Sequence, residues 1–256
     1  MRFSMPSLPQ WTNSTLRRLN IGFQCAICAR AGGNDLDLCD DCESLLHRCV
    51  IEDPSGYVYG LCLGCGAELA GPDSELCCTE CDGSTAPFTR IVAPYRYEFP
   101  FDRLIQSLKY RDQRVLGRVF GTLLARAVRL RATAGGALPT QLIPVPLHVS
   151  RLRERGYNQS ADIARWCAYE LGIESRSRAA SREYDTGSLA GLTRAERQHR
   201  ILGAFRAQEQ VADRHVAIVD DVLTTGSTGR ELARELYDTG AASVELWVLA
   251  RTSSSR

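Results

Sequence analysis

The sequence predicts an α/β protein in which a parallel sheet with flanking helices follows a small cysteine-rich domain. Three observations lead to this prediction. From residue 90 onward, short apolar runs alternate with amphipathic stretches, as in parallel sheets covered by helices. Ten of the 11 cysteines precede residue 82. Charge divides in the same way, because residues 1–92 hold 6 arginines and 12 acidic residues, whereas residues 93–256 hold 24 arginines, one lysine and 18 acidic residues. A basic second domain suits an anionic ligand.

The composition is that of an ordinary globular protein, with 44% hydrophobic and 24% charged residues. No stretch approaches the roughly 20 continuous apolar residues of a membrane-spanning helix, so no membrane insertion is expected. Residues 1–24 contain Arg2, Arg17 and Arg18 but no acidic residue, which is a weak feature of transit peptides. Because they lack the apolar segment of a secretion signal, these residues are predicted to form a loose N-terminal tail.

Residues 25–87 are predicted to form a zinc-ribbon domain that contains four CxxC pairs: Cys25/Cys28, Cys39/Cys42, Cys62/Cys65 and Cys78/Cys81. Two thiolates separated by two residues can both point inward from a tight turn and fill half of a tetrahedral zinc shell. Four such pairs predict two structural Zn²⁺ sites in a reducing compartment. The simplest partition is sequential, but pairing the second CxxC with the third also leaves an acceptable spacer, so the sequence leaves the partition open.

The sequence leaves two roles open for zinc in this domain. It replaces a hydrophobic core that is too small to form by itself, or it shapes a docking surface for nucleic acid or protein. The acidic balance of this half argues against direct phosphate contacts. A catalytic metal is not expected, because four thiolates close the coordination shell. Cys49, Cys77 and Cys167 are left over and are expected to be buried free thiols.

The second domain, residues 88–256, is expected to begin after a small polar linker, Gly83 to Pro87. Its predicted strands, from apolar runs, are Arg90–Tyr97, Gln141–Leu147, Val216–Val219 and Val244–Leu249. Its predicted helices, from apolar residues at helical spacing, are Phe101–Tyr110, Arg114–Leu130, a helix capped by Asn158 or Ser160 that ends at Gly172, and Ser227–Tyr237.

The most informative segment runs from Val216 to Thr228. Four apolar strand residues lead to two adjacent carboxylates, Asp220 and Asp221, and then to a hydroxyl-rich turn that opens a helix. Ligands of open α/β sheets bind at this edge, and a helix N-terminus suits a phosphate. Gly226 permits close backbone approach. The acidic residues would repel a phosphate that they faced, so they are predicted to hold a hydroxylated group or a divalent cation beside it, such as ribose hydroxyls with Mg²⁺.

This segment resembles the thirteen-residue phosphoribosyl pyrophosphate (PRPP) signature of type I phosphoribosyltransferases. The resemblance implies a type I phosphoribosyltransferase-like sheet and a PRPP ligand. In that family the two acids bracket the ribose 2′- and 3′-hydroxyls, and the loop cradles the 5′-phosphate. Carried over to this sequence, the PRPP-binding residues are Asp220, Asp221, Val222, Leu223, Thr224, Thr225, Gly226, Ser227 and Thr228.

A second resemblance narrows the family. Four features are similar to sequence motifs of the ComF competence family. They are Ile143-Pro144-Val145-Pro146-Leu147, the arginine-rich run from Arg151 to Gln159, Leu108-Lys109-Tyr110-Arg111 and the four CxxC pairs. The similarity covers about residues 25–251. By position, it implies that Val145 to Val149 form the pyrophosphate loop. The residues expected at the pyrophosphate are Arg151, Arg155, Asn158, Gln159 and Lys109, the one lysine of the chain.

Residues Arg182 to Phe205 correspond to the mobile loop and following helix of this family, which close over the reaction. A lid should carry cations to meet the leaving pyrophosphate, as Arg194, Arg197 and Arg200 would. The expected catalytic residues are Asp220, Asp221 and Arg197. The family pattern has Gln where Leu189 stands and Asn where Arg200 stands, and these departures bear on turnover rather than on PRPP binding.

Two functions follow as hypotheses. The first is a phosphoribosyltransferase that binds PRPP with Mg²⁺, displaces pyrophosphate at C1′ and transfers phosphoribosyl to an unknown acceptor. The second is a non-catalytic, PRPP-regulated module that binds single-stranded DNA or proteins of the competence machinery. The ComF resemblance implies a cytoplasmic role in natural competence and DNA uptake for either. Exposed aromatics for base stacking are not evident from the spacing alone.

Overall fold

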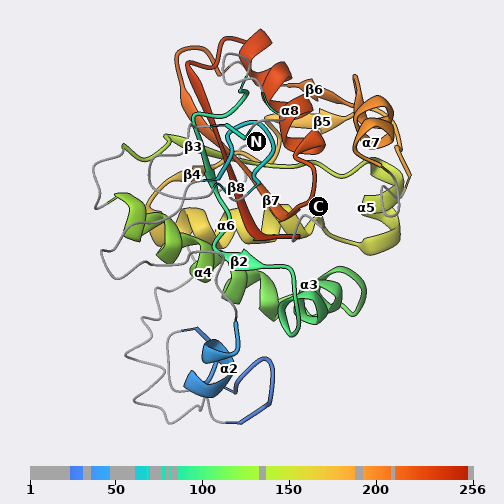
Figure 1. The fold of residues 1–256 in the computed structure, drawn as a ribbon. Coiled ribbons are helices and arrows are strands. Elements are labelled where there is room, and N and C mark those ends of the chain that lie inside the picture. Colours follow the sequence, from blue (N-terminus) through green and yellow to red (C-terminus); the bar gives the residue numbers. More distant parts are fainter. Residues whose placement is uncertain are drawn as a thin grey trace, which may run out of the picture. The chain divides into compact units, whose positions relative to one another are not determined.

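A computed structural model describes residues 24–30, 36–46, 61–67, 69, 77–78, 81, 86–132, 137–187, 193–208 and 211–252 (Figure 1). The chain divides into two compact units, residues 1–45 and 46–256. The predicted domain boundary before residue 88 stays a prediction. Nearly all of the predicted N-terminal tail, Cys49 and most of the predicted linker lie outside the described residues.

The first unit contains helix α2 (Asp40–Ser44), which begins directly after Cys39. A tight turn precedes it, in which the backbone N–H of Ala29 donates to the carbonyl of Cys25 at 2.8 Å. The turn and the start of the helix therefore carry one CxxC pair each.

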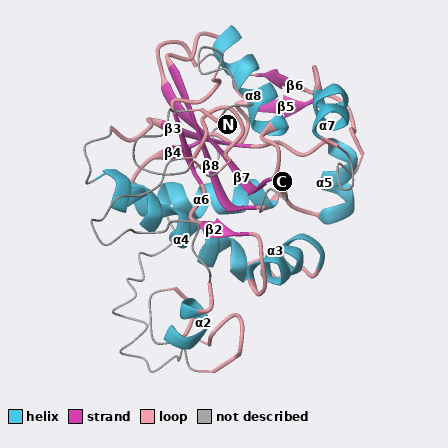
Figure 2. Ribbon diagram, in the orientation of Figure 1, coloured by secondary structure: helices cyan, strands magenta, loops and turns pink. Residues whose placement is uncertain are grey.

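The second unit contains a parallel sheet with the strand order β1-β8-β7-β3-β4, and β2 pairs with the far end of β8. Its strands are β1 (Arg90–Val92), β2 (Tyr95–Arg96), β3 (Gln141–Pro144), β4 (Glu174–Ser175), β7 (His215–Leu223) and β8 (Ser243–Arg251). Strands β5 (Ala180–Arg182) and β6 (Phe205–Ala207) form a separate antiparallel pair (Figure 2). The helices are α3 (Phe101–Tyr110), α4 (Val115–Ala132), α5 (Val149–Arg155), α6 (Gln159–Leu171), α7 (Arg194–Ile201) and α8 (Ser227–Asp238).

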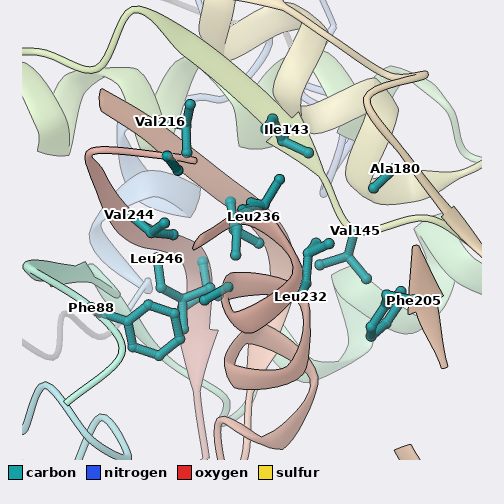
Figure 3. Packing of buried hydrophobic residues seen from close by; sticks show 14 of the residues in the cluster. Phe88, Ile143, Val145, Ala180, Phe205, Val216, Leu232, Leu236, Val244 and Leu246 are labelled. Carbon is teal, nitrogen blue, oxygen red and sulfur yellow. The ribbon is translucent and has the colours of Figure 1, made fainter. Parts of the chain in front are cut away.

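Helices cover both faces of this sheet, with α4 and α6 on one side and α8 on the other (Figure 1). On the α8 side, Val216 and Val244 of the sheet pack with Leu232 and Leu236 of the helix (Figure 3). On the other side, Gly121 of α4 lets the two helices meet closely, since a Cβ there would lie 2.5 Å from the Cβ of Trp166. The predicted fold class is confirmed.

The elements differ from the predicted ones in several places, among them the predicted strand Arg90–Tyr97, which is divided into β1 and β2, and β4, which was not predicted. Strand β7 continues through both acidic residues to Leu223 instead of ending at Val219. Strand β3 ends at Pro144, and the run to Leu147 leaves the sheet, because Pro146 has no N–H to donate to a ladder. Helix α5 and the β5–β6 pair were not predicted. None of the described helices combines the length and apolar character that crossing a bilayer requires.

Candidate functional site

The turn between β7 and α8 lies at the carboxyl end of the central strand. Gly226 occupies the N-cap position of α8 in a left-handed conformation, with φ of 72°. The hydroxyl groups of Thr225 and Ser227 share a hydrogen bond of 2.8 Å, and the guanidinium of Arg230 donates to the carbonyl of Thr225 at 2.9 Å. A positive φ is easily reached only by glycine, so the conformation of this turn depends on the glycine at position 226.

A small cavity opens at this turn. It is lined by Asp220, Val222, Leu223, Thr224, Gly226, Ser227, Thr228, Gly229, Leu246 and Val248. Seven of these lining residues belong to the predicted PRPP segment. The N-terminal end of α8 contributes Ser227, Thr228 and Gly229, so the positive end of the helix dipole lies beside the cavity.

The two adjacent acidic residues lie on opposite faces of β7, because successive side chains of a strand alternate. Asp220 lines the cavity, and its Oδ1 accepts a hydrogen bond from the hydroxyl of Ser160 at 2.8 Å. Asp221 is buried and forms an ion pair of 2.5 Å with the ammonium of Lys109, near the end of α3. Their joint contact with one ribose therefore stays a prediction.

Burial and neighbouring charges shift the pKa values of Asp220 and Lys109. Burial and the neighbouring charge of Asp221 raise the pKa of Asp220 to about 7, although the hydrogen bond from Ser160 and the charge of Lys109 oppose this. Burial alone would lower the pKa of Lys109, but its contact with Asp221 outweighs burial and raises that pKa. Asp220 is thus poised between its neutral and charged forms near neutral pH. A divalent cation would favour the charged form.

The predicted pyrophosphate loop is tied to the start of α6. The side-chain oxygen of Asn158 caps this helix by accepting from the backbone N–H groups of Ser160 at 3.0 Å and Ala161 at 3.4 Å. Its amide nitrogen donates to the carbonyl of Val145 at 2.9 Å. Gln159 is buried. The predicted cap is confirmed, and Asn158 connects the start of α6 with the predicted pyrophosphate loop.

The predicted pyrophosphate arginines have local partners. Arg151 pairs with Glu154 at 3.0 Å and approaches Asp185 at 3.9 Å. Arg155 donates to the side chain of Gln159 and lies 5.3 Å from the ring centroid of Tyr110. The roles of Arg151, Arg155 and Lys109 at a pyrophosphate are not tested by these contacts and stay predictions.

Helix α7 lies in the predicted lid. Thr193 and Glu196 form a capping box at its start. The buried Nε of Arg197 has no hydrogen-bond partner within the described part of the chain. Arg200 is exposed. Leu189 and the side chain of Arg194 lie outside the described residues.

Some residues beside the site were missed from the sequence. Ser160 was considered only as a helix cap, but its hydroxyl holds Asp220. Burial lowers the pKa of the Arg182 guanidinium while the charge of Asp220 opposes this, so Arg182 also belongs to the surroundings of that acid. No local sequence pattern identifies either residue, because each lies far from Asp220 in the sequence and only the fold brings it close.

The cysteines form two clusters, Cys25/Cys28/Cys39/Cys42 and Cys62/Cys65/Cys78/Cys81, each with all four sulfur atoms within 4.8 Å of one another. The sulfur atoms of Cys28 and Cys39 are 3.6 Å apart, and those of Cys65 and Cys78 are 3.8 Å apart. Tetrahedral zinc with bonds of about 2.3 Å requires sulfur atoms about 3.8 Å apart, so both clusters fit zinc. The sequential partition is the one that the structure forms.

Backbone groups favour ionisation of one thiol in each cluster, whereas burial raises the pKa values of Cys42 and Cys65. Burial opposes ionisation of Cys62, but backbone N–H groups of Cys78, Cys65 and Gly64 outweigh it and lower its pKa to about 6. Burial likewise opposes ionisation of Cys25, whose pKa is lowered to about 6 by backbone N–H groups, that of Cys28 foremost. Each cluster therefore has a thiol that ionises readily, as metal ligation requires.

Comparisons with known proteins agree with this architecture. Residues 142–256 match the family model described as phosphoribosyl transferase domain. DNA utilization protein YhgH of Escherichia coli K12 is 32% identical over 235 residues, which cover 89% of this chain and 90% of the relative. Competence protein F of Haemophilus influenzae is 33% identical over 222 residues, covering 84% and 90%.

More distant proteins match as well. Competence protein ComFC of Streptococcus pneumoniae is 23% identical over 220 residues, covering 85% of this chain and 89% of its own. A solved purine phosphoribosyltransferase from Pyrococcus horikoshii aligns over 52% of this chain and 70% of its own, at 19% identity and a TM-score of 0.31.

Proposed function

Because this chain belongs to the ComF family of proteins with a phosphoribosyltransferase domain, we propose that it binds PRPP with Mg²⁺ and serves in DNA uptake or use. The observation that carries the proposal is the cavity in which Asp220 faces the turn at the start of α8. A phosphate and a hydroxylated sugar need this combination of a helix N-terminus and a carboxylate.

In the proposed complex, the 5′-phosphate lies on the turn Thr224–Thr228. Asp220 accepts a hydrogen bond from one ribose hydroxyl. If the second hydroxyl binds Asp221, it does so at a carboxylate that also pairs with Lys109. Bound Mg²⁺ would neutralise pyrophosphate charge, and Asp220 would supply it with a carboxylate oxygen ligand.

The pyrophosphate extends toward the Asn158 end of α6, where Arg151, Arg155 and Gln159 are close along the chain. In the first of the two candidate functions, the protein is an enzyme that turns over PRPP. A nucleophile displaces pyrophosphate at C1′, and the protein contributes positioning and stabilisation of the leaving group, with Arg197 of α7 as the cation of the lid.

The binding proposal is tested by titrating PRPP with Mg²⁺ into the Asp220→Asn and Asp221→Asn variants. We expect affinity to fall at least ~10-fold for each, because each loses a charged hydrogen-bond acceptor worth about 1.5–3 kcal/mol. Asp238→Asn, at the opposite end of α8 and 62% exposed, is the matched control. Unchanged affinity in both site variants, with native circular dichroism, would refute the ribose assignment.

Turnover needs a separate measurement. Pyrophosphate release from PRPP is assayed with a panel of nucleobases, and release with any member of the panel supports the enzyme. No release across the panel, in protein that binds PRPP by calorimetry, contradicts transfer to these acceptors and favours the second function.

A surface on α4 and α6 favours that second function, a PRPP-regulated module for single-stranded DNA. Tyr169 is 76% exposed, and its ring meets that of Trp166 at a centroid distance of 6.0 Å. The guanidinium groups of Arg118 and Arg165 lie 6.0 and 5.5 Å from the indole centroid. Single-strand binders combine stacking aromatics with cations in this way.

The test is fluorescence anisotropy of labelled single-stranded DNA across a salt series. We expect affinity to fall with rising salt, and Trp166→Ala/Tyr169→Ala to weaken binding about 10-fold or more. Tyr237→Ala, on α8, is the matched aromatic control. Affinity that is independent of salt, or equal in the site variant and the control, counts against this surface.

A further inference from the structure

The turn that carries Cys62 and Cys65 packs against the turn between β7 and α8. A Cβ on Gly66 would lie 2.2 Å from Cδ2 of Leu223, the last residue of β7. A Cβ on Gly226, the N-cap of α8, would lie 3.7 Å from both the Cα of Cys65 and the carbonyl oxygen of Gly64. The two turns therefore meet through glycines, Gly66 against the side chain of Leu223 and Gly226 against the backbone of the cysteine turn.

The cysteine turn is closed and anchored. The backbone N–H of Gly66 donates to the carbonyl of Cys62 at 2.7 Å. Leu61 and Leu63, on either side of Cys62, pack against the hydrophobic core that includes Leu223. This turn is thus fixed at one end by the core and can transmit its shape to the neighbouring turn.

The second cysteine pair of the same cluster contacts the same turn. A Cβ on Gly64 would lie 2.8 Å from the Cβ of Cys81 and 2.9 Å from its sulfur. All four sulfur atoms lie within 4.8 Å of one another. A metal at this cluster would therefore hold the turn between Cys62 and Cys65 by binding it to the second cysteine pair.

We propose that the second cysteine cluster is a positioning element of the phosphate-binding turn. Zinc on Cys62, Cys65, Cys78 and Cys81 holds the turn 61–67, which in turn holds Leu223 and Gly226 in the conformation that receives a phosphate. This inference rests on the proposed binding of PRPP and adds a role for one of the two clusters. The first cluster belongs to the other compact unit and serves as the comparison.

The physical reason is that a CxxC turn of a few residues has little stability without its metal. Once the metal is lost, the backbone donors at the start of α8 lose their support and converge less well on a phosphate. Coupling between two sites is reciprocal, so phosphate bound at α8 must in turn strengthen the retention of zinc at this cluster.

The main experiment compares equivalent cysteine substitutions in the two clusters. Cys62→Ser/Cys65→Ser is set against Cys25→Ser/Cys28→Ser in the full chain. Zinc content is measured by mass spectrometry, folding by thermal melting, and affinity for PRPP with Mg²⁺ by calorimetry. We expect each variant to lose one zinc, the second-cluster variant to lose about 10-fold or more in affinity, and the first-cluster variant to change by less than about twofold. Equal affinities in the two variants overturn the inference.

A milder variant covers the case in which the cysteine changes unfold the protein. Gly66→Ala keeps all four ligands, but its methyl group meets Leu223 and pushes the two turns apart. Gly172→Ala is the matched control, because Gly172 has a similar φ of +69° against +72° for Gly66 and nothing within 4 Å. Weaker PRPP binding by Gly66→Ala at full zinc content supports the inference, and equal binding by both variants overturns it.

A third measurement separates this inference from the proposed function. Hydrogen exchange of the peptide that covers residues 223–230 is followed without ligand, in wild type and in Cys62→Ser/Cys65→Ser. Faster exchange in the variant supports the positioning role even if wild type fails to bind PRPP, an outcome that refutes only the proposed function. Equal exchange overturns the positioning role. With PRPP bound, slower transfer of zinc to a chromogenic chelator is the expected reciprocal effect, and an unchanged rate contradicts it.

Discussion

The ammonium of Lys109 lies 2.5 Å from the carboxylate of Asp221 and joins the last turn of α3 to the central strand β7. Their side chains are only 21% and 6% exposed. The one lysine of an arginine-rich chain therefore neutralises the buried carboxylate of Asp221. An ammonium suits this position because it is a compact charge that one carboxylate can match.

Replacement of Lys109 by Met should leave Asp221 buried without a countercharge. Breaking one side of a buried pair typically costs about 3–5 kcal/mol, so we expect a loss of ~3 kcal/mol in the free energy of unfolding. Urea denaturation measures this. The double variant Lys109→Met/Asp221→Asn should recover most of the loss, and a double variant no more stable than Lys109→Met contradicts the pairing.

Stability should fall between about pH 4 and pH 7 through Asp220. Its pKa is raised from 3.8 to about 7 in the folded protein by burial and by Asp221. In this range the folded state holds a proton that the unfolded state has released, so rising pH favours unfolding. At pH 8, Asp220→Asn should be more stable than wild type by ~1–3 kcal/mol. Parallel pH profiles of the two proteins in urea denaturation would contradict this.

Affinity for PRPP with Mg²⁺ should rise as the pH passes through about 7, because ligand binding requires the charged form of Asp220. PRPP itself titrates in this range, so the informative quantity is the ratio of affinities of wild type and Asp220→Asn. We expect calorimetry to show this ratio increase several-fold from pH 6 to pH 8. A constant ratio would mean that Asp220 does not ionise on binding.

Two substitutions at Asn158 should separate its two roles. Asn158→Ala removes both the cap of α6 and the hydrogen bond to Val145, and should cost about 1–2 kcal/mol in urea denaturation. Asn158→Asp keeps a capping oxygen but loses the donor to Val145. It should preserve most of the stability while weakening pyrophosphate binding about 3–10-fold by calorimetry. Equal stability of the two variants would show that the cap contributes little.

Much of the fold was predictable because it follows local rules. The α6 boundaries depend on Asn158 as a cap and on Gly172 in a left-handed conformation, and both are evident in the sequence. The end of β7 was not predictable, because aspartate is disfavoured in strands and a pattern-based boundary stops before Asp220. Ladder pairing with β8 carries the strand through both acids to Leu223.

The site was predictable in its residue types but not in its contacts. The motif placed Asp220 beside the turn at Gly226, and the cavity brings them together. The pairing of Asp221 with Lys109 spans more than a hundred residues, and no local spacing encodes such a contact. The partition of the cysteines was equally undetermined, since both pairings gave acceptable spacers and only the folded chain selects one.

The alternation along β7 has a consequence for how this sequence can change. Asp220 and Asp221 are served by different helices, Ser160 of α6 and Lys109 of α3. Insertion or deletion of a single residue within the strand would exchange the surroundings of the two carboxylates, whereas length changes in the connections that precede it would leave both in place. Homologous chains should therefore tolerate indels in those connections and exclude them between His215 and Leu223.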